Sequence, residues 1–259
     1  MAIRVLITAG GTSEKIDNVR RITNSGTGRL GALVCEAFAA SGEDCRITYI
    51  CSANAVRPHM RRDGRVTVHM ADDVQTLRDT VEQTLREVPF DVIIHSMAVG
   101  DYTVRAVTDA KLMTGGVMDR IEAAARGDSA PAREAVMDGI LAPPRIRDAK
   151  ISSDKENLII VLEKAPKIIA ILRALAPEAV IVGFKLMSDV SEEELIGAGR
   201  ALLEKNDCDF VLANDMRTVR TDRHEGVLLS RAGGAEKAFG KGEIAGLIVR
   251  CTIERVLRK

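Results

Sequence analysis

The segment at residues 7–31, ITAGGTSEKIDNVRRITNSGTGRLG, decides the fold that we expect for this chain. It begins inside the aliphatic run at 3–8, which is typical of a buried strand, and leads into a helical pattern at 30–41. Glycines between a strand and a helix let a ligand approach the backbone, and the amides at a helix N-terminus bind phosphate. The segment therefore predicts a strand, a phosphate-binding turn and a helix.

Short aliphatic runs alternate with helical patterns along most of the remaining chain. Further strands are expected at 45–50, 91–98, 179–184 and 209–214, and further helices at about 72–87, after Ser191 and at the C-terminus, where a hairpin precedes the last helix. Ser191 followed by Glu194 is the pattern of a capping box. This alternation is typical of an α/β fold, here Rossmann-like, with three layers around a mostly parallel sheet.

The composition excludes several classes of protein. The 259 residues include 37 basic and 37 acidic side chains, so the formal net charge is zero, which argues against nucleic acid as the main partner. A hydrophobic content of 46% argues against disorder. No apolar run of about 18 residues and no leader pattern is present, which argues against a membrane protein. We expect a globular enzyme or ligand-binding protein in the cytoplasm.

The five cysteines are Cys35, Cys45, Cys51, Cys208 and Cys251. Their number is odd and none forms a C-x-x-C pair, so we expect reduced and mostly buried thiols. The four histidines have no metal-ligand spacing, and His95, near the end of an expected strand, is expected to be a packed structural residue.

Gly26, Gly28 and Gly31 also match the G-x-G-x-x-G pattern of dinucleotide-binding proteins. Gly26, however, lies 26 − 8 = 18 residues beyond the first expected strand, whereas the fingerprint normally follows that strand directly. The second strand offers no acidic residue for a ribose, and Tyr102 is followed four positions later by Ala106 rather than lysine. The pattern favours a phosphate-binding helix N-terminus, and a short-chain-type NAD(P)-dependent reductase stays as the alternative.

The polar stretch between the two glycine groups is too long for a simple strand-to-helix turn. Arg20, Arg21, Asn24 and Ser25 are expected to gather near the helix N-terminus, where they would hold an anionic substrate that contains an amide. The alternative is that both arginines are solvated surface charges.

Residues 115–149 interrupt the α/β alternation and contain Pro131, Pro143 and Pro144. We expect an inserted flap or arm, helical around 118–126 and 131–139. The alternative is a surface insertion without fixed structure.

Six motifs occur in an order that resembles the phosphopantothenate–cysteine ligases. They are TAGGTSEKIDNVRRITN with its following glycines, AVGDY (98–102), KISS (150–153), APKII (165–169), VGFKL (182–186) and DFVLAND (209–215). The matches span residues 7–215. Since the chain begins at the ligase strand, with no flavin-dependent decarboxylase segment in front, it resembles the stand-alone form.

The resemblance implies a single ligase domain over 1–259, with a flap or dimerisation arm at about 103–165. It also implies a homodimer that joins 4′-phosphopantothenate to L-cysteine. CTP, with Mg²⁺, would activate the carboxylate as an acyl-cytidylate and leave as CMP and pyrophosphate. ATP is the alternative nucleotide, and a ligase relative without catalytic activity is a further alternative.

The resemblance also implies the site residues. Asn24, Arg20 and Lys150 are expected to be catalytic, the first two by contacting the substrate. The nucleotide is expected to contact Gly10, Gly11, Ser25, Gly28, Ala98, Asp101, Lys150, Phe184, Lys185 and Asn214. Asp101 would contact the nucleotide or the metal. Alternatives are a core role for Phe184, a surface charge at Lys185 and a turn or cap role for Asn214.

Two positions depart from the family pattern. Gly100 stands where alanine or serine is usual, and Ser153 replaces the last lysine of the bacterial bifunctional motif.

Overall fold

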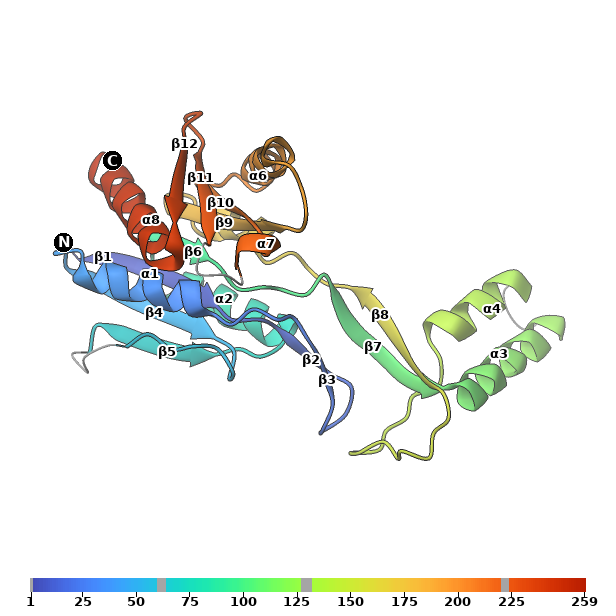
Figure 1. Ribbon diagram of the computed structural model, residues 1–259. Coiled ribbons are helices and arrows are strands. Elements are labelled where there is room, and N and C mark those ends of the chain that lie inside the picture. Colours follow the sequence, from blue (N-terminus) through green and yellow to red (C-terminus); the bar gives the residue numbers. More distant parts are fainter. Residues whose placement is uncertain (1, 60–63, 127–131, 220–223) are drawn as a thin grey trace. The chain divides into compact units, whose positions relative to one another are not determined.

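The computed structural model describes residues 2–59, 64–126, 132–219 and 224–259, which pack as two compact units (Figure 1). Unit 1 contains Met1–Thr12, Asn24–Val99 and Lys167–Lys259, and unit 2 contains Ser13–Thr23 and Gly100–Pro166. The chain thus leaves unit 1 twice, once within the glycine-rich segment 7–31.

An eight-stranded sheet forms the centre of unit 1 within the described residues. In spatial order its strands are β12 (Ala235–Phe239), β11 (Glu225–Ser230), β10 (Phe210–Asp215), β9 (Val180–Met187), β6 (Val92–His95), β1 (Ile3–Ala9), β4 (Cys45–Cys51) and β5 (Val66–Met70). The six strands from β10 to β5 are parallel, and the hairpin β11–β12 adds two antiparallel strands. The expected mostly parallel sheet is confirmed.

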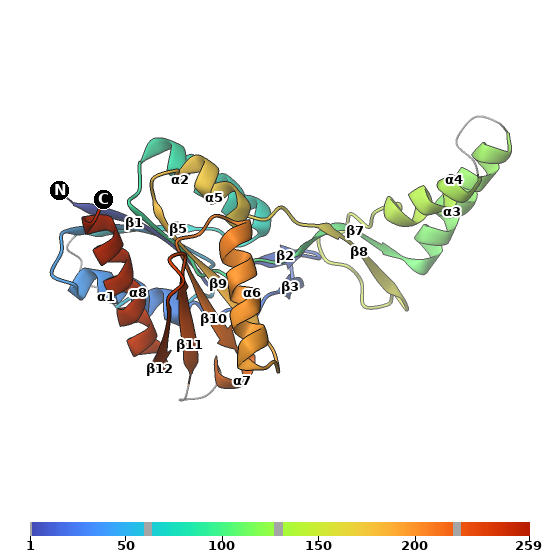
Figure 2. The same ribbon diagram turned by 90° about the horizontal axis from the view of Figure 1, so that it is seen from above.

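Helices cover both faces of this sheet, as Figure 2 shows. They are α1 (Arg29–Ala40), α2 (Val74–Glu87), α5 (Ile169–Leu175), α6 (Glu192–Lys205), the short α7 (Met216–Val219) and α8 (Gly240–Leu257). On the α1 and α8 face, the alternate residues Val5 and Ile7 of β1 pack with Val34, Phe38 and Ile248 in one buried cluster. Burial of these aliphatic side chains is the main force that holds the three layers together.

Most elements expected in unit 1 from local sequence patterns are present. The capping box is present, since Ser191 Oγ accepts from Glu194 N at 3.2 Å and Ser191 N donates to Glu194 Oε2 at 2.9 Å. The strand expected at 91–98 ends earlier, at His95, and beyond it only an isolated parallel bridge joins Ala98 to Gly11. All five cysteines are unpaired, and only Cys251 is not fully buried.

Unit 2 contains two antiparallel strand pairs and a pair of helices in its described part. These are β2 (Ser13–Lys15) with β3 (Arg21–Thr23), β7 (Tyr102–Asp109) with β8 (Leu158–Lys164), and α3 (Ala110–Ala125) packed on α4 (Ala132–Leu141). The inserted segment is therefore structured. Its first helix begins earlier than expected because Asp109 caps it, accepting a hydrogen bond from Leu112 N at 2.8 Å. Pro131, where the second helix was expected to begin, lies outside the described residues.

None of the helices in the described ranges combines the length and the apolar character that crossing a bilayer requires.

Candidate active site

The glycine-rich edge of unit 1 lies where β1 and β6 end. The chain continues from β1 through α1 to β4 on one side, whereas β6 pairs with β1 on the other side. Such a reversal of strand order creates a crevice at the carboxyl ends of the strands, which is where open α/β sheets bind ligands. We use the name glycine edge for Gly10, Gly11 and the segment 24–28.

The two glycine groups of the sequence meet at this edge, although 14 residues separate Gly11 from Gly26. Gly26 N donates to Asn24 O at 2.9 Å, and a Cβ added at Gly26 would collide with the backbone oxygen of Gly10. A Cβ at Gly11 would likewise collide with Asn24 O. Residues 13–23 thus leave the strand-to-helix turn and return to it. Glycine is required where the two ends of this segment touch.

Helix α1 begins at this edge without a side-chain cap. Its N-cap residue Gly28 has φ +72°, and a Cβ there would lie 3.0 Å from Gly10 N. The first turn of α1 contains no acidic residue. Its amides and the positive end of the helix dipole are therefore suited to a phosphate group. Gly10, Gly11 and Gly28 lie together as the sequence predicts, and the exposed Ser25 lies between Asn24 and Gly26.

Asn24 is held at the same edge by its own amide. Its backbone N donates to Thr12 O at 3.0 Å, and its side-chain Nδ2 donates to Ala98 O at 3.3 Å. Ala98 also accepts from Thr12 N at 3.1 Å and donates to Gly10 O at 2.8 Å. The half-exposed Asn24 keeps its side-chain oxygen available beside the helix N-terminus, so the structure brings Asn24 and Ala98 together with the glycines.

Thr8 and His95 form the buried floor beneath this edge. His95 Nδ1 lies 2.9 Å from Thr8 Oγ1, and Met97 N donates to the same hydroxyl at 3.4 Å. Ser96 adds two bonds to Thr8 O, from its backbone N at 3.1 Å and from its Oγ at 2.7 Å. Burial lowers the pKa of His95 from 6.5 to about 4, so the ring is neutral near pH 7. The expectation of a packed structural histidine is confirmed.

The remaining predicted residues of unit 1 lie in the second half of β9 and near the end of β10. Phe184 is partly buried against the core cluster, and Lys185 is half-exposed on the opposite face of β9. Asn214 is buried, with its Nδ2 3.1 Å from Nε2 of the buried His224. Its amide therefore already has a partner inside the protein. Contacts of these three residues with a nucleotide stay predictions.

In unit 2 the turn between β2 and β3 holds the segment around Lys150. The buried carboxylate of Asp17 accepts from Val19 N at 2.7 Å, Arg20 N at 2.6 Å and Ile151 N at 3.1 Å. These backbone hydrogen bonds, with a smaller contribution from the Arg20 guanidinium, hold the pKa of Asp17 below its usual range. The carboxylate is therefore ionised at neutral pH and ties two distant segments together.

The guanidinium of Arg20 also joins the two segments. Its Nη1 lies 3.2 Å from Asp17 Oδ2 and 3.3 Å from Ile151 O. Asn18 N also donates to Ala149 O at 3.0 Å. Lys150 thus lies between two anchored residues with its own side chain exposed. The structure brings Arg20 to the Lys150 segment, whereas the sequence predicts it near the N-terminus of the helix that follows.

Asp101, expected at the nucleotide or the metal, is exposed and precedes β7 in unit 2. Its backbone oxygen accepts from Ala165 N at 2.9 Å. Among the described residues no group of three or more histidine, cysteine, aspartate or glutamate side chains could hold a metal ion. Magnesium in nucleotide sites often takes only one or two carboxylates, together with phosphates and water, so a single carboxylate is compatible with such an ion.

Two residues that shape the candidate site, Asp17 and His224, were not predicted from the sequence. Asp17 is an aspartate whose carboxylate accepts from amides two and three residues later, a local pattern typical of Asx turns, so the motif IDNVR contained a usable signal. The sequence contained no such signal for His224, because its contact with Asn214 depends on how the β11–β12 hairpin packs against β10.

The chain is similar in sequence to proteins of coenzyme A biosynthesis. A family profile described as DNA/pantothenate metabolism flavoprotein C-terminal domain matches residues 1–128 and 122–255. The chain is 28% identical over 228 residues to the coenzyme A biosynthesis bifunctional protein CoaBC of Thermococcus kodakarensis, covering 88% of this chain and 45% of that protein. For the same-named protein of Methanocaldococcus jannaschii the identity is 27% over 214 residues, covering 82% and 40%. The chain thus spans less than half of these relatives.

A solved structure agrees over the full length of the chain. The DNA/pantothenate metabolism flavoprotein from Streptococcus pneumoniae superposes with a TM-score of 0.77 at 30% identity, covering 98% of this chain and 100% of that chain.

Proposed function

The chain belongs to the DNA/pantothenate metabolism flavoprotein C-terminal domain family, and from this premise we propose that it is a phosphopantothenate–cysteine ligase. The observation that supports this most is the glycine edge, where an uncapped helix N-terminus lies beside the Asn24 amide. Such an edge suits a phosphate together with a substrate that both donates and accepts hydrogen bonds. The proposed substrates are 4′-phosphopantothenate, L-cysteine and a nucleoside triphosphate.

The proposed reaction has two balanced steps. A carboxylate oxygen of phosphopantothenate attacks the α-phosphorus of CTP and expels pyrophosphate, which gives an acyl-cytidylate. The amine of cysteine then attacks the acyl carbon, loses a proton and expels CMP, which leaves an amide. A carboxylate is a poor electrophile, so activation supplies the leaving group, and the protein chiefly orients the reactants and stabilises charge.

Asn24 is proposed to bind the pantothenate part and its acyl intermediate. Its Nδ2 is held by Ala98 O, so the direction of the amide is fixed before substrate arrives. A neutral amide can accept from a substrate N–H without repelling the carboxylate, which an aspartate would repel. Gly10, Gly11, Ser25 and Gly28 would face the phosphates, and the base would contact the ends of β9 and β10.

Lys150 is proposed to act on the nucleotide and the activated intermediate. The Asp17 turn fixes the backbone on both sides of it, so only the lysine side chain needs to move. Mg²⁺, held by the triphosphate and Asp101, would screen phosphate charge. Arg20 would support this arrangement through Asp17 and Ile151.

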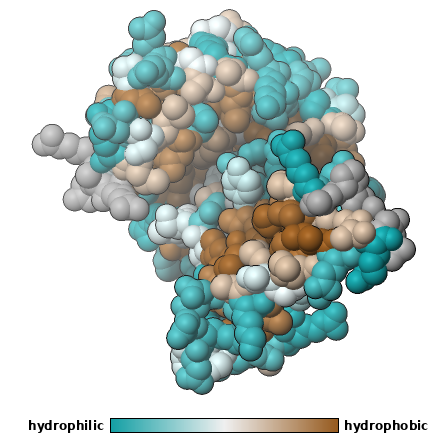
Figure 3. All heavy atoms as spheres, turned by 90° about the vertical axis from the view of Figure 1, so that its right-hand side faces the viewer, coloured by the Kyte–Doolittle hydropathy of each residue, from teal (hydrophilic) through white to brown (hydrophobic). Residues whose placement is uncertain are grey.

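A homodimer is the proposed assembly, and the α3–α4 pair is the expected contact surface. Five side chains on these two helices are apolar and more than a third exposed: Leu112, Met118, Met137, Ile140 and Leu141. Figure 3 shows hydrophobic side chains gathered on this face of the protein. Exposed apolar patches commonly mark protein interfaces. The five unpaired cysteines fit a reducing compartment, and we propose the cytoplasm.

The experiment measures pyrophosphate and CMP from the purified chain. We expect pyrophosphate release to require both phosphopantothenate and CTP, and CMP release to follow the addition of cysteine. Asn24→Asp and Lys150→Gln should each lower the rate by about 10²–10³-fold, the loss typical of a charge-stabilising group. Lys205→Gln removes an exposed lysine at the end of α6 and should leave the rate unchanged.

The same experiment separates the alternatives. Equal or faster turnover with ATP would replace CTP in the proposal while keeping the ligation. A folded protein that binds nucleotide but releases no pyrophosphate would be a relative without catalytic activity, and NADPH-dependent reduction would identify a reductase. Either of the last two results would refute the proposed ligase.

A further inference from the structure

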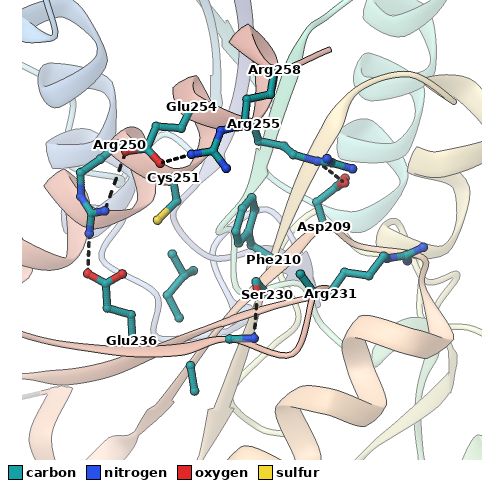
Figure 4. Close-up of a pocket in the computed structure, with 14 residues that line it drawn as sticks. Asp209, Phe210, Ser230, Arg231, Glu236, Arg250, Cys251, Glu254, Arg255 and Arg258 are labelled. Atoms are coloured by element: carbon teal, nitrogen blue, oxygen red, sulfur yellow. Dashed lines mark hydrogen bonds and ion pairs between the residues drawn. The ribbon is translucent and has the colours of Figure 1, made fainter.

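A cavity of about 600 Å³ lies in unit 1, between α8 and the start of β10 beside the β11–β12 hairpin (Figure 4). Phe210 is the first residue of β10, whereas Asn214 lies near the opposite end of the same strand. Four residues of extended strand separate the two by about 13 Å. The cavity thus lies at the amino-terminal edge of the parallel strands, and the residues expected to bind the nucleotide lie at the carboxyl-terminal edge.

The lining of this cavity is apolar at its base and charged at its rim. Phe210, Leu228 and Cys251 supply the apolar surface, and Phe210 is only partly buried against the core. Arg255 and Arg258 extend over it from α8. An apolar base with a few convergent polar groups, in a cavity of this size, is the usual composition of a small-molecule site.

Four arginines line the cavity, and Arg231 and Arg250 form close ion pairs with Asp207 and Glu236. Arg255 and Arg258 are only weakly engaged within the protein. Arg255 Nε lies 3.8 Å from Asp209 Oδ1, and that carboxylate already accepts from Arg173 Nη2 at 2.7 Å and Ile181 N at 3.0 Å. Arg258 Nη2 lies 3.7 Å from Glu254 Oε2. The side chains of Arg255 and Arg258 are 53% and 77% exposed. Long, solvent-exposed ion pairs of this kind contribute little and can be exchanged for a ligand anion.

We propose that this cavity binds an amphipathic organic anion. Its flat apolar group lies against Phe210 and Cys251, and its carboxylate, sulfonate or phosphate group lies between Arg255 and Arg258. An aromatic ring supplies large apolar contact area, and a guanidinium can bind such an anionic group through two parallel hydrogen bonds. The site is independent of the proposed ligase reaction, because none of the residues assigned to that reaction lines it.

The probe that tests this is 8-anilinonaphthalene-1-sulfonate, which combines a fused aromatic ring with one sulfonate and fluoresces when its ring leaves water. We expect saturable binding by the full chain with a stoichiometry of one. The double variant Arg255→Gln/Arg258→Gln should raise the Kd at least about tenfold, since the charge-assisted hydrogen bonds to the sulfonate are lost.

Arg86→Gln is the matched control, because Arg86 is also an exposed helical arginine paired with a glutamate one turn away. It should bind the probe as the unchanged protein does. Urea unfolding of all three proteins establishes that the variants remain folded.

Cys251 reports whether the probe occupies this cavity. It is the only one of the five cysteines that is not fully buried, so iodoacetamide should modify it first. Burial raises the pKa of this thiol, so the reaction is followed at mildly alkaline pH. Saturating probe should slow the modification at least about tenfold in the unchanged protein but not in the double variant. Absence of saturable binding, equal Kd values in the double variant, or modification unaffected by the probe would each overturn the proposal.

Discussion

We expect protonation of His95 to destabilise the buried Thr8–His95 contact beneath the glycine edge. The ring is 7% exposed, and the one bond that it makes from a ring nitrogen is to Thr8 Oγ1 at 2.9 Å. Burial of the imidazolium in this place is unfavourable, which lowers the pKa of His95 from 6.5 to about 4. The stability of the protein should therefore depend on pH in a window that this one residue helps to set.

The direction and size follow from proton binding. Between pH 6.5 and 4 the unfolded chain binds a proton at this position and the folded chain does not, so the free energy of unfolding falls as the pH falls. Lowering the pKa of His95 from 6.5 to about 4 corresponds to about 3 kcal/mol, of which roughly 2 kcal/mol is lost between pH 7 and 5. Burial also lowers the pKa of His224 to about 4, so its contribution falls in the same window.

Comparison with His95→Gln isolates the first histidine. Glutamine can still bond to Thr8 but does not titrate, so urea unfolding at pH 7, 6 and 5 should show the unchanged protein losing roughly 2 kcal/mol more than the variant. The proton resonances of the His95 ring should titrate near pH 4. Equal losses in the two proteins, or a ring that titrates above pH 6, would refute the reasoning.

Four further substitutions test separate parts of the structure. Gly26→Ala should lower turnover about a hundredfold, as a misplacement of about 1 Å does, because the added Cβ collides with the backbone opposite. Gly197→Ala, with open space around its Cβ, should instead keep the rate and add about 0.5–1 kcal/mol of stability. Asp17→Asn should speed amide hydrogen exchange at Ile151 and lower turnover, and unchanged exchange would show that the carboxylate does not hold this segment. Ser191→Ala should cost about 1 kcal/mol in urea unfolding with no change in turnover.

The sequence predicts unit 1 well because its core elements have strong local patterns. The strands β1 and β4 are short runs in which most positions are buried, and α6 begins with a capping box. The strand β5 was missed, since at the sheet edge most of its side chains are exposed and little apolar pattern remains. Likewise α3 has no buried side chain, so its first two turns gave no periodic apolar signal.

The candidate site likewise contains residues whose proximity the sequence predicts and contacts that it does not predict. The glycines and Asn24 lie in one continuous motif, so their proximity to a helix N-terminus was predictable. The bond from Ile151 N to Asp17 joins residues 134 positions apart, and the contact of Asn214 with His224 depends on a hairpin returning to its neighbouring strand. Such contacts are set by tertiary packing, which no local propensity encodes.

The most direct test of the proposed chemistry follows one oxygen atom. Phosphopantothenate labelled with ¹⁸O in its carboxylate is incubated with the purified chain, CTP, Mg²⁺ and cysteine, and the CMP is analysed by mass spectrometry. An acyl-cytidylate requires the bridging carboxylate oxygen to leave with the phosphorus, so each CMP formed should contain one ¹⁸O atom. CMP without the label, formed together with the cysteine amide, would contradict the acyl-nucleotide route.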